Sequence, residues 1–139
     1  MIYENMFKHK NHQRVFDPAT KGIKYLSHRY HGISENEVYD SYKIFFGTLV
    51  SEPRLKIINL LKGGEKRVSE IMKELKVDQT SLSHNLARLR NCGFVECKID
   101  GRFRIYSLNK KTISPLMKII DVHMSENCVH ILRSMKGEK

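Results

Sequence analysis

The sequence predicts a mainly α fold of the α+β class, in which helices surround one small β-hairpin. Residues 68–75 and 79–92 both repeat apolar side chains at helical spacing, with a break at residues 76–78. Residues 94–108 then alternate as two strands around Asp100-Gly101, a dipeptide typical of a two-residue hairpin turn. Helix, turn, helix and hairpin in unbroken succession indicate a winged helix-turn-helix.

The second helix of the pair, residues 79–92, is expected to read double-stranded DNA. Asp78 can cap its start by accepting from free backbone N–H groups, and Gly93 suits a left-handed cap at its end. Leu82, Leu86 and Leu89 form one narrow apolar stripe. The other side offers hydrogen-bonding groups without carboxylates, which suits a major groove. The predicted DNA contacts on this helix are Gln79, Thr80, Ser81, Ser83, His84 and Arg88.

The hairpin at residues 94–108 is expected to be the wing. Its predicted contacts to phosphates or a minor groove are Lys98, Arg102 and Arg104. The net charge of +10 favours nucleic acid, although a membrane surface or solubility would also explain it. Residues 79–104 hold five basic and two acidic side chains and so supply only +3 of that charge. The order of the elements therefore carries the prediction, and the charge only agrees with it.

Two flanking helices predict a homodimer. Residues 34–37 form a capping box before an aromatic and aliphatic face, and Ser114-Pro115 is typical of a helix start. A small three-helix core cannot bury both apolar faces, so we expect them to pair across a two-fold axis. The predicted interface residues are Tyr42, Phe45, Leu49, Leu116, Ile120, Met124 and Ile131.

The chain of 139 residues is long enough for one core with an extension. We expect an N-terminal basic arm over residues 1–33, which either packs along the dimer or touches DNA. The winged domain then covers residues 34–139, with the C-terminal dimerisation helix at 115–136. No apolar run reaches the ~20 residues of a membrane span. The N-terminus has no apolar stretch of the kind found in signal peptides, so we expect a cytoplasmic protein with free cysteines.

Four runs of the sequence together resemble a known family. They are SEPRLKIINLL at 51–61, which is followed by GE at 64–65, VDQTSLSHNL at 77–86, GFV at 93–95 and DGR at 100–102. Residues 40–108 thereby resemble the ArsR/SmtB family of small transcriptional repressors. The resemblance implies a homodimer on a double-stranded DNA operator, which many members release when a metal or another inducer binds. It leaves the inducer unknown.

The resemblance also implies two possible metal sites, and this chain departs from both. Members that bind soft metals carry Cys-x-Cys at the start of the first helix of the helix-turn-helix, where Arg67 and Ser69 stand here. Neither supplies a thiolate, so that site is excluded. Members that bind zinc use four positions of the last helix, which fall on Lys110, Thr112, His123 and Glu126. Half of that set cannot ligate zinc.

We therefore expect no metal and no cofactor. The alternative is a metal-responsive repressor of the zinc or nickel type with a displaced site in the last helix. Its candidate ligands are Asp121, His123, Glu126, Cys128 and His130.

No catalytic residues are expected. Ser83 and His84 are helical neighbours whose side chains diverge by about 100°, so they cannot form a nucleophile and base pair. The sequence has no glycine-rich phosphate loop. A winged helix that binds protein or structured RNA remains a second alternative, which the polar outer side of residues 79–90 disfavours.

Overall fold

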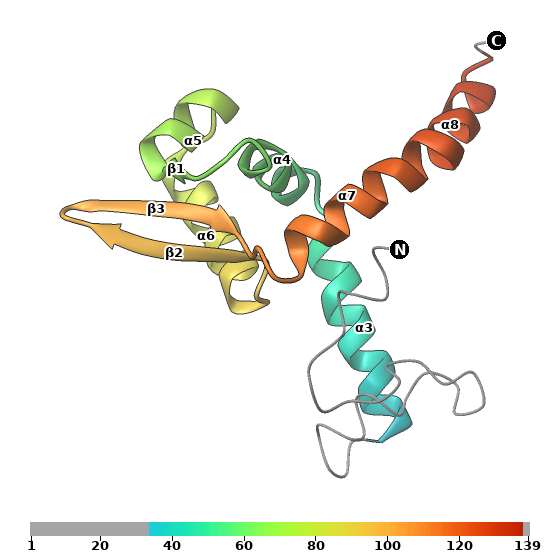
Figure 1. Cartoon of the computed structure of the whole chain (residues 1–139), viewed down its shortest axis with the longest axis horizontal. Helices are drawn as coiled ribbons and strands as arrows, with labels where there is room; N and C mark the ends of the chain where they lie inside the picture. The colour runs from blue at the N-terminus through green and yellow to red at the C-terminus, as the bar shows by residue number, and fades with distance from the viewer. Residues whose placement is uncertain (1–33, 138–139) are drawn as a thin grey trace. The chain divides into compact units, whose positions relative to one another are not determined.

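The structure is a computed structural model that describes residues 34–137, and it confirms the predicted mainly α, winged helix-turn-helix fold (Figure 1). The described part of the chain divides between Phe46 and Gly47 into two units. The predicted arm at residues 1–33 lies outside the described residues. In chain order the elements are α3 (Glu35–Leu49), α4 (Glu52–Leu61), β1 (Lys66–Arg67), α5 (Val68–Leu75), α6 (Gln79–Asn91), β2 (Val95–Asp100), β3 (Phe103–Leu108), α7 (Ile113–His123), a π-helical turn (Met124–Cys128) and α8 (Val129–Met135).

Helix α3 begins with the predicted capping box. The Ser34 backbone N–H donates to Glu37 Oε2 at 2.7 Å, and the Glu37 backbone N–H donates to Ser34 Oγ at 3.2 Å. Hydrogen bonds from the backbone N–H and then the hydroxyl of Ser34 lower the pKa of the Glu37 carboxyl. Further along α3, the ring of Phe46 stacks with Tyr42 and meets Phe45 edge-on, which gives the predicted aromatic face.

Helix α6 is bounded by the two caps that the sequence predicted. At its start, the Ser81 backbone N–H donates to Asp78 Oδ1 at 2.8 Å. It ends at Asn91, one residue earlier than predicted, and Gly93 follows with a φ of +76°. The Phe94 N–H donates to Leu89 O at 2.8 Å and the Gly93 N–H to Arg90 O at 3.0 Å, which is a Schellman motif. This motif turns the chain directly from α6 into the wing.

The wing is the hairpin of β2 and β3, and it belongs to a three-stranded antiparallel sheet of order β1-β3-β2. The predicted turn is shifted by one residue, because Asp100 pairs with Phe103 and leaves Gly101 and Arg102 as the two turn residues. Gly101 has a φ of +61° and Arg102 does not have a positive φ, as in a type II′ turn. The short strand β1 was not predicted; it pairs Arg67 with Ile105.

The core of the second unit lies between α4, α5, α6 and the base of the wing. Buried side chains come from each of these elements and from the start of α7; they are Ile57, Ile58, Leu61, Ile71, Leu82, Leu86, Leu89, Phe94, Val95, Tyr106, Leu108, Ile113 and Met117. The hairpin projects away from this core (Figure 1). Its tip is therefore free to meet another molecule.

The C-terminal helix differs from its predicted bounds of 115–136. It begins at Ile113, two residues earlier than predicted, with Thr112 at the N-cap and no side-chain cap hydrogen bond. In the turn just before it, Asn109 Oδ1 accepts from the backbone N–H groups of Lys111 and Thr112. It also contains the π-helical turn at Met124–Cys128, which no local signal predicted. The wider turn changes the phase of the apolar stripe, so the residues before and after it do not form one continuous face.

Replacing Gly93 with alanine should lower the free energy of unfolding by about 1 to 2 kcal/mol, because a side chain at a φ of +76° strains the backbone. An added Cβ at Gly93 would meet no atom within 4 Å, so the cost comes from the backbone alone. Gly63→Ala is the control. It lacks a positive φ, and its Cβ would meet only Leu60 O at 3.5 Å. Urea denaturation that finds equal stabilities for the two variants would contradict the strain argument.

Candidate nucleic-acid interface

One stripe of α6 is fully buried, and this fixes which side of the helix faces solvent. Leu82, Leu86 and Leu89 are at most 1% exposed. All six predicted DNA contacts on α6, Gln79, Thr80, Ser81, Ser83, His84 and Arg88, are exposed. The solvent side of α6 therefore presents amide, hydroxyl, imidazole and guanidinium groups without a carboxylate.

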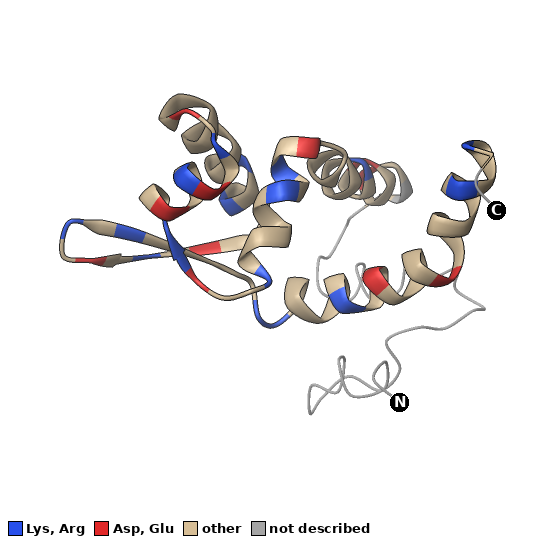
Figure 2. Ribbon diagram, turned by 90° about the horizontal axis from the view of Figure 1, so that it is seen from above, with Lys and Arg blue, Asp and Glu red and all other residues tan. Residues whose placement is uncertain are grey.

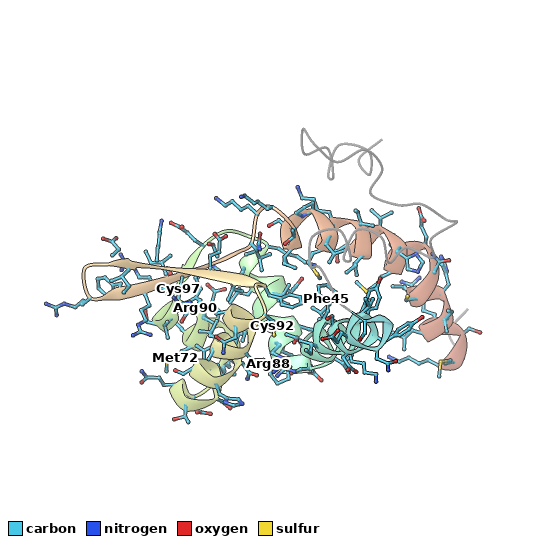
Figure 3. The ribbon with its side chains drawn as sticks, turned by 90° about the horizontal axis from the view of Figure 1, so that it is seen from below. Phe45, Met72, Arg88, Arg90, Cys92 and Cys97 are labelled. Atoms are coloured by element: carbon cyan, nitrogen blue, oxygen red, sulfur yellow. The ribbon has the colours of Figure 1, made fainter. Side chains whose placement is uncertain are left out.

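A groove of about 550 Å³ runs between α6 and the wing, and we call it the α6–wing groove. Its polar lining includes Gln79, Ser83 and Arg90 from α6, Arg67 from β1, and Arg102 and Arg104 from the wing. Thr80, His84 and Arg88 form the neighbouring row on α6 and do not line it. Figure 3 shows Arg90 between α6 and the hairpin, with Arg88 on the side away from the hairpin.

The three predicted wing contacts do not lie together. Arg102 and Arg104 line the α6–wing groove, but Lys98 does not. Lys98 pairs with Ile105 and Ile99 with Arg104, so alternation along the strands puts Lys98 and Arg104 on opposite faces of the hairpin. The Lys98 Nζ instead forms an ion pair with Glu65 at 2.9 Å. Basic positions are visible at the tip of the hairpin and along its strands (Figure 2).

Two basic residues of the groove, Arg67 and Arg90, were missed as interface residues by sequence reasoning. Arg67 lies with its guanidinium 4.2 Å from the centre of the Phe103 ring, a cation–π contact between β1 and the wing. Arg67 stands one position before α5. In the sequence this position stands out only because family members that bind soft metals carry a cysteine there. The contact depends on the pairing of β1 with β3. Strand β1 has only two residues, which are too few to show the alternation that predicts a strand from sequence.

Tyr106 forms part of the groove lining from the base of the wing, where it is 6% exposed. Burial raises the pKa of its phenol, and a hydrogen bond with Cys97, its partner across the hairpin, raises it further. A hydrogen bond with Arg104 and its positive charge lower the pKa of the Tyr106 phenol, but by less. The phenol is therefore neutral at physiological pH and keeps its O–H as a donor. Cys97, Cys92 and Cys128 are free thiols.

The five candidate metal ligands of the last helix are not brought together within one chain. Both carboxylate oxygens of Asp121 accept from Lys62 Nζ at 2.9 Å, which ties α7 to the end of α4. Asn127 donates to the backbone oxygen of His123 at 3.1 Å. Glu126, Cys128 and His130 are exposed. Within residues 34–137, no group of three or more His, Cys, Asp or Glu side chains has the spacing of a metal site.

The predicted dimer residues differ in how far the single chain covers them. Leu116 and Ile120 are half-buried, whereas Met124 and Ile131 are exposed. Every residue from Val122 to Gly137 is exposed, and this stretch carries apolar side chains at several positions; they are Val122, Met124, Val129, Ile131, Leu132 and Met135. In α3, Tyr42 is exposed while Phe45 and Leu49 are half-buried.

No helix in the described part of the chain is long and apolar enough to cross a membrane.

A buried leucine stripe, a polar outer face and a basic hairpin beside it define a winged helix-turn-helix protein. The sequence pattern of the arsR family of bacterial regulatory proteins matches residues 51–96. The transcriptional repressor SdpR of Bacillus subtilis is 36% identical over 61 residues, which cover 43% of this chain and 68% of SdpR.

Two solved structures are similar as well. The crystal structure of Rv0081 from Mycobacterium tuberculosis is 26% identical, with a TM-score of 0.64, and the match covers 68% of this chain and 96% of that one. The solution structure of a possible ArsR-family regulator from Mycobacterium bovis, described as a homodimeric winged helix-turn-helix DNA-binding domain, is 26% identical with a TM-score of 0.63. That match covers 73% of this chain and 95% of the other. The chain belongs to the ArsR family of bacterial regulatory proteins.

Proposed function

We propose that the chain is a homodimeric transcription regulator that binds a specific double-stranded DNA operator and acts as a repressor. The observation that carries the proposal is the exposed, carboxylate-free side of α6 beside a wing that presents Arg102 and Arg104. A helix of this kind can enter a major groove while its buried stripe holds it on the core. The similar proteins are regulators rather than enzymes, which supports a role without catalysis.

The first turns of α6 are proposed to read base edges, because the N-terminal residues of a recognition helix reach deepest into the groove. The Gln79 amide can make a bidentate contact with adenine, and Ser83 and His84 can each donate or accept. Thr80, Ser81 and Arg88 complete the proposed contact surface. Arg102 and Arg104 are proposed to bind phosphate oxygens. Lys98 can bind a phosphate only if its ion pair with Glu65 breaks.

A second copy of the chain is proposed to cover the apolar residues of the last helix. Six large apolar side chains between Val122 and Met135 are exposed, and apolar side chains gathered on one segment are typical of an interaction surface. The homodimeric state of the Mycobacterium bovis relative supports this assignment. The dimer would set the distance between two α6 helices, which must match successive major grooves about 34 Å apart.

Repression is proposed from the family resemblance and from SdpR, which is named as a repressor. A dimer that occupies promoter DNA can exclude the transcription machinery without any further activity. Reporter expression from the chain's own promoter should rise when its gene is deleted, and a fall would reverse the proposed sign of regulation.

The variant with both Gln79→Ala and His84→Ala should lose operator preference and keep its fold, because both side chains are exposed. Loss of the bidentate contact of Gln79 should by itself remove about 1 to 3 kcal/mol of discrimination between operator and mixed-sequence DNA, and loss of the His84 contact should add to this. Footprinting on the chain's own promoter region measures the effect. Asn59→Ala, which removes an exposed amide from α4, serves as the control. An unchanged footprint in the double variant would refute the placement of the reading surface.

Ile131→Glu should convert the dimer into a monomer without unfolding the chain, because this side chain is 61% exposed in the single subunit. A buried, unpaired carboxylate at a dimer interface is strongly unfavourable. Sedimentation measures the mass. Arg133→Glu is the control, since it lies two residues along and on another side of α8. A dimer of unchanged stability in Ile131→Glu would place the interface elsewhere.

Zinc, nickel, cobalt and arsenite should fail to release the protein from DNA. Arg67 and Ser69 occupy the thiolate positions, and the Asp121 carboxylate is already engaged by Lys62. A nearly complete switch requires a differential affinity of about 5.5 kcal/mol, which isolated exposed imidazoles do not supply. Fluorescence anisotropy of the protein–DNA complex during titration with each ion tests this. Release at stoichiometric metal that is lost in His123→Ala would establish the metal-responsive alternative.

A further inference from the structure

We propose that the α6–wing groove holds the phosphate backbone of one DNA strand, and that Arg67 and Arg90 bind its phosphates alongside Arg102 and Arg104. Arg67 is held in position for this by its stacking on Phe103. The inference rests on the proposed function, since it names the part of the duplex that enters this groove and two residues that contact it.

The groove has the charge of an anion site. Its lining contains four arginines and neither an aspartate nor a glutamate. Within residues 34–137, none of these four guanidinium groups forms an ion pair with a carboxylate. The Glu70 carboxylate is engaged by the Arg67 backbone N–H at 2.7 Å, and Glu70 does not line the groove. A lining with four arginines and no carboxylate gives the groove a positive potential, which favours an anion.

The position of the groove selects a duplex backbone as that anion. One wall is α6, whose outer side suits a major groove, and the other is the wing, which reaches toward the neighbouring minor groove. In B-form DNA the phosphate backbone of one strand separates a major groove from the next minor groove. If both walls engage the same duplex, that strand must pass between them.

Arg67 suits this position better than a lysine would. Its guanidinium lies over the Phe103 ring, with Cζ 4.2 Å from the ring centre, while its N–H groups stay available for phosphate oxygens. The same contact joins the start of α5 to the wing, and the backbone pairing of Arg67 with Ile105 lies beside it. The cation–π contact therefore helps to hold the position of the charge, while the backbone pairing of β1 with β3 holds the wing.

The test uses the full chain and a short duplex of mixed sequence, because phosphate contacts do not depend on base sequence. Fluorescence anisotropy gives the affinity at several salt concentrations. Arg67→Gln and Arg90→Gln should each lower the slope of log affinity against log salt by about 0.9, and the double variant by about 1.8. Lys118→Gln is the matched control, since it removes one exposed positive charge from α7, which does not line the groove. Its slope should equal that of the unmodified protein.

The stacking is tested separately. Arg67→Lys and Phe103→Leu should both keep the positive charge but weaken binding to the duplex at constant salt. Phe103→Leu should weaken binding less when Arg67→Gln is already present, because the two side chains act as one unit. Effects that simply add would overturn the positioning role of Phe103. Thermal unfolding of each variant separates a loss of contacts from a loss of fold.

The outcomes separate this inference from the proposed function. An unmodified protein that binds neither the mixed duplex nor its own promoter region at low salt would overturn both. An unmodified protein that binds while Arg67→Gln and Arg90→Gln keep its salt slope would overturn only the phosphate groove. A slope lowered equally by Lys118→Gln would show that net charge, rather than the groove, governs binding.

Discussion

Burial of one leucine stripe is the constraint on which the rest of this structure depends. Leu82, Leu86 and Leu89 are almost completely removed from water, and each contributes about 1.5 to 3 kcal/mol of hydrophobic stabilisation. Any rotation of α6 about its axis would expose them, so the opposite side of the helix must face solvent. The Schellman motif at Gly93 then directs Phe94 back into the same core and starts the wing at a set point. The leucine stripe thus positions both walls of the α6–wing groove.

The basic residues of the wing have two different roles, because one is held in an ion pair and the others are available to a ligand. Lys98 is paired with Glu65, and this ion pair ties β2 to the loop before β1. Such an exposed pair contributes little to stability and weakens with salt. Arg102 and Arg104 have no acidic partner within residues 34–137 and line the groove with Arg67 and Arg90. Charge count alone would treat all of these residues alike, whereas the structure gives Lys98 a carboxylate partner and gives the four arginines none among residues 34–137.

The last helix has a buried beginning and an exposed remainder. Ile113 and Met117 pack into the core, and Asp121 is held by Lys62. Every residue from Val122 to Gly137 is exposed, and the π-helical turn at Met124–Cys128 lies just after the start of this stretch. A π-helical turn inserts one extra residue and rotates the helix beyond it. The exposed apolar residues of α8 can therefore face a different direction from those buried in α7, which is the arrangement that a second subunit requires.

The sequence by itself determined the features that depend on residues within one turn of each other. These are the capping box at Ser34, the cap at Asp78, the left-handed Gly93 and the stripe of α6, and all four are present because each is a local hydrogen bond, dihedral preference or periodicity. Only the tertiary structure decided which basic residues share the groove. The contact of Arg67 with Phe103 and the pairing of Lys98 with Glu65 join residues more than 30 positions apart. No periodicity marks such pairs, since they exist only once β1, β2 and β3 have paired.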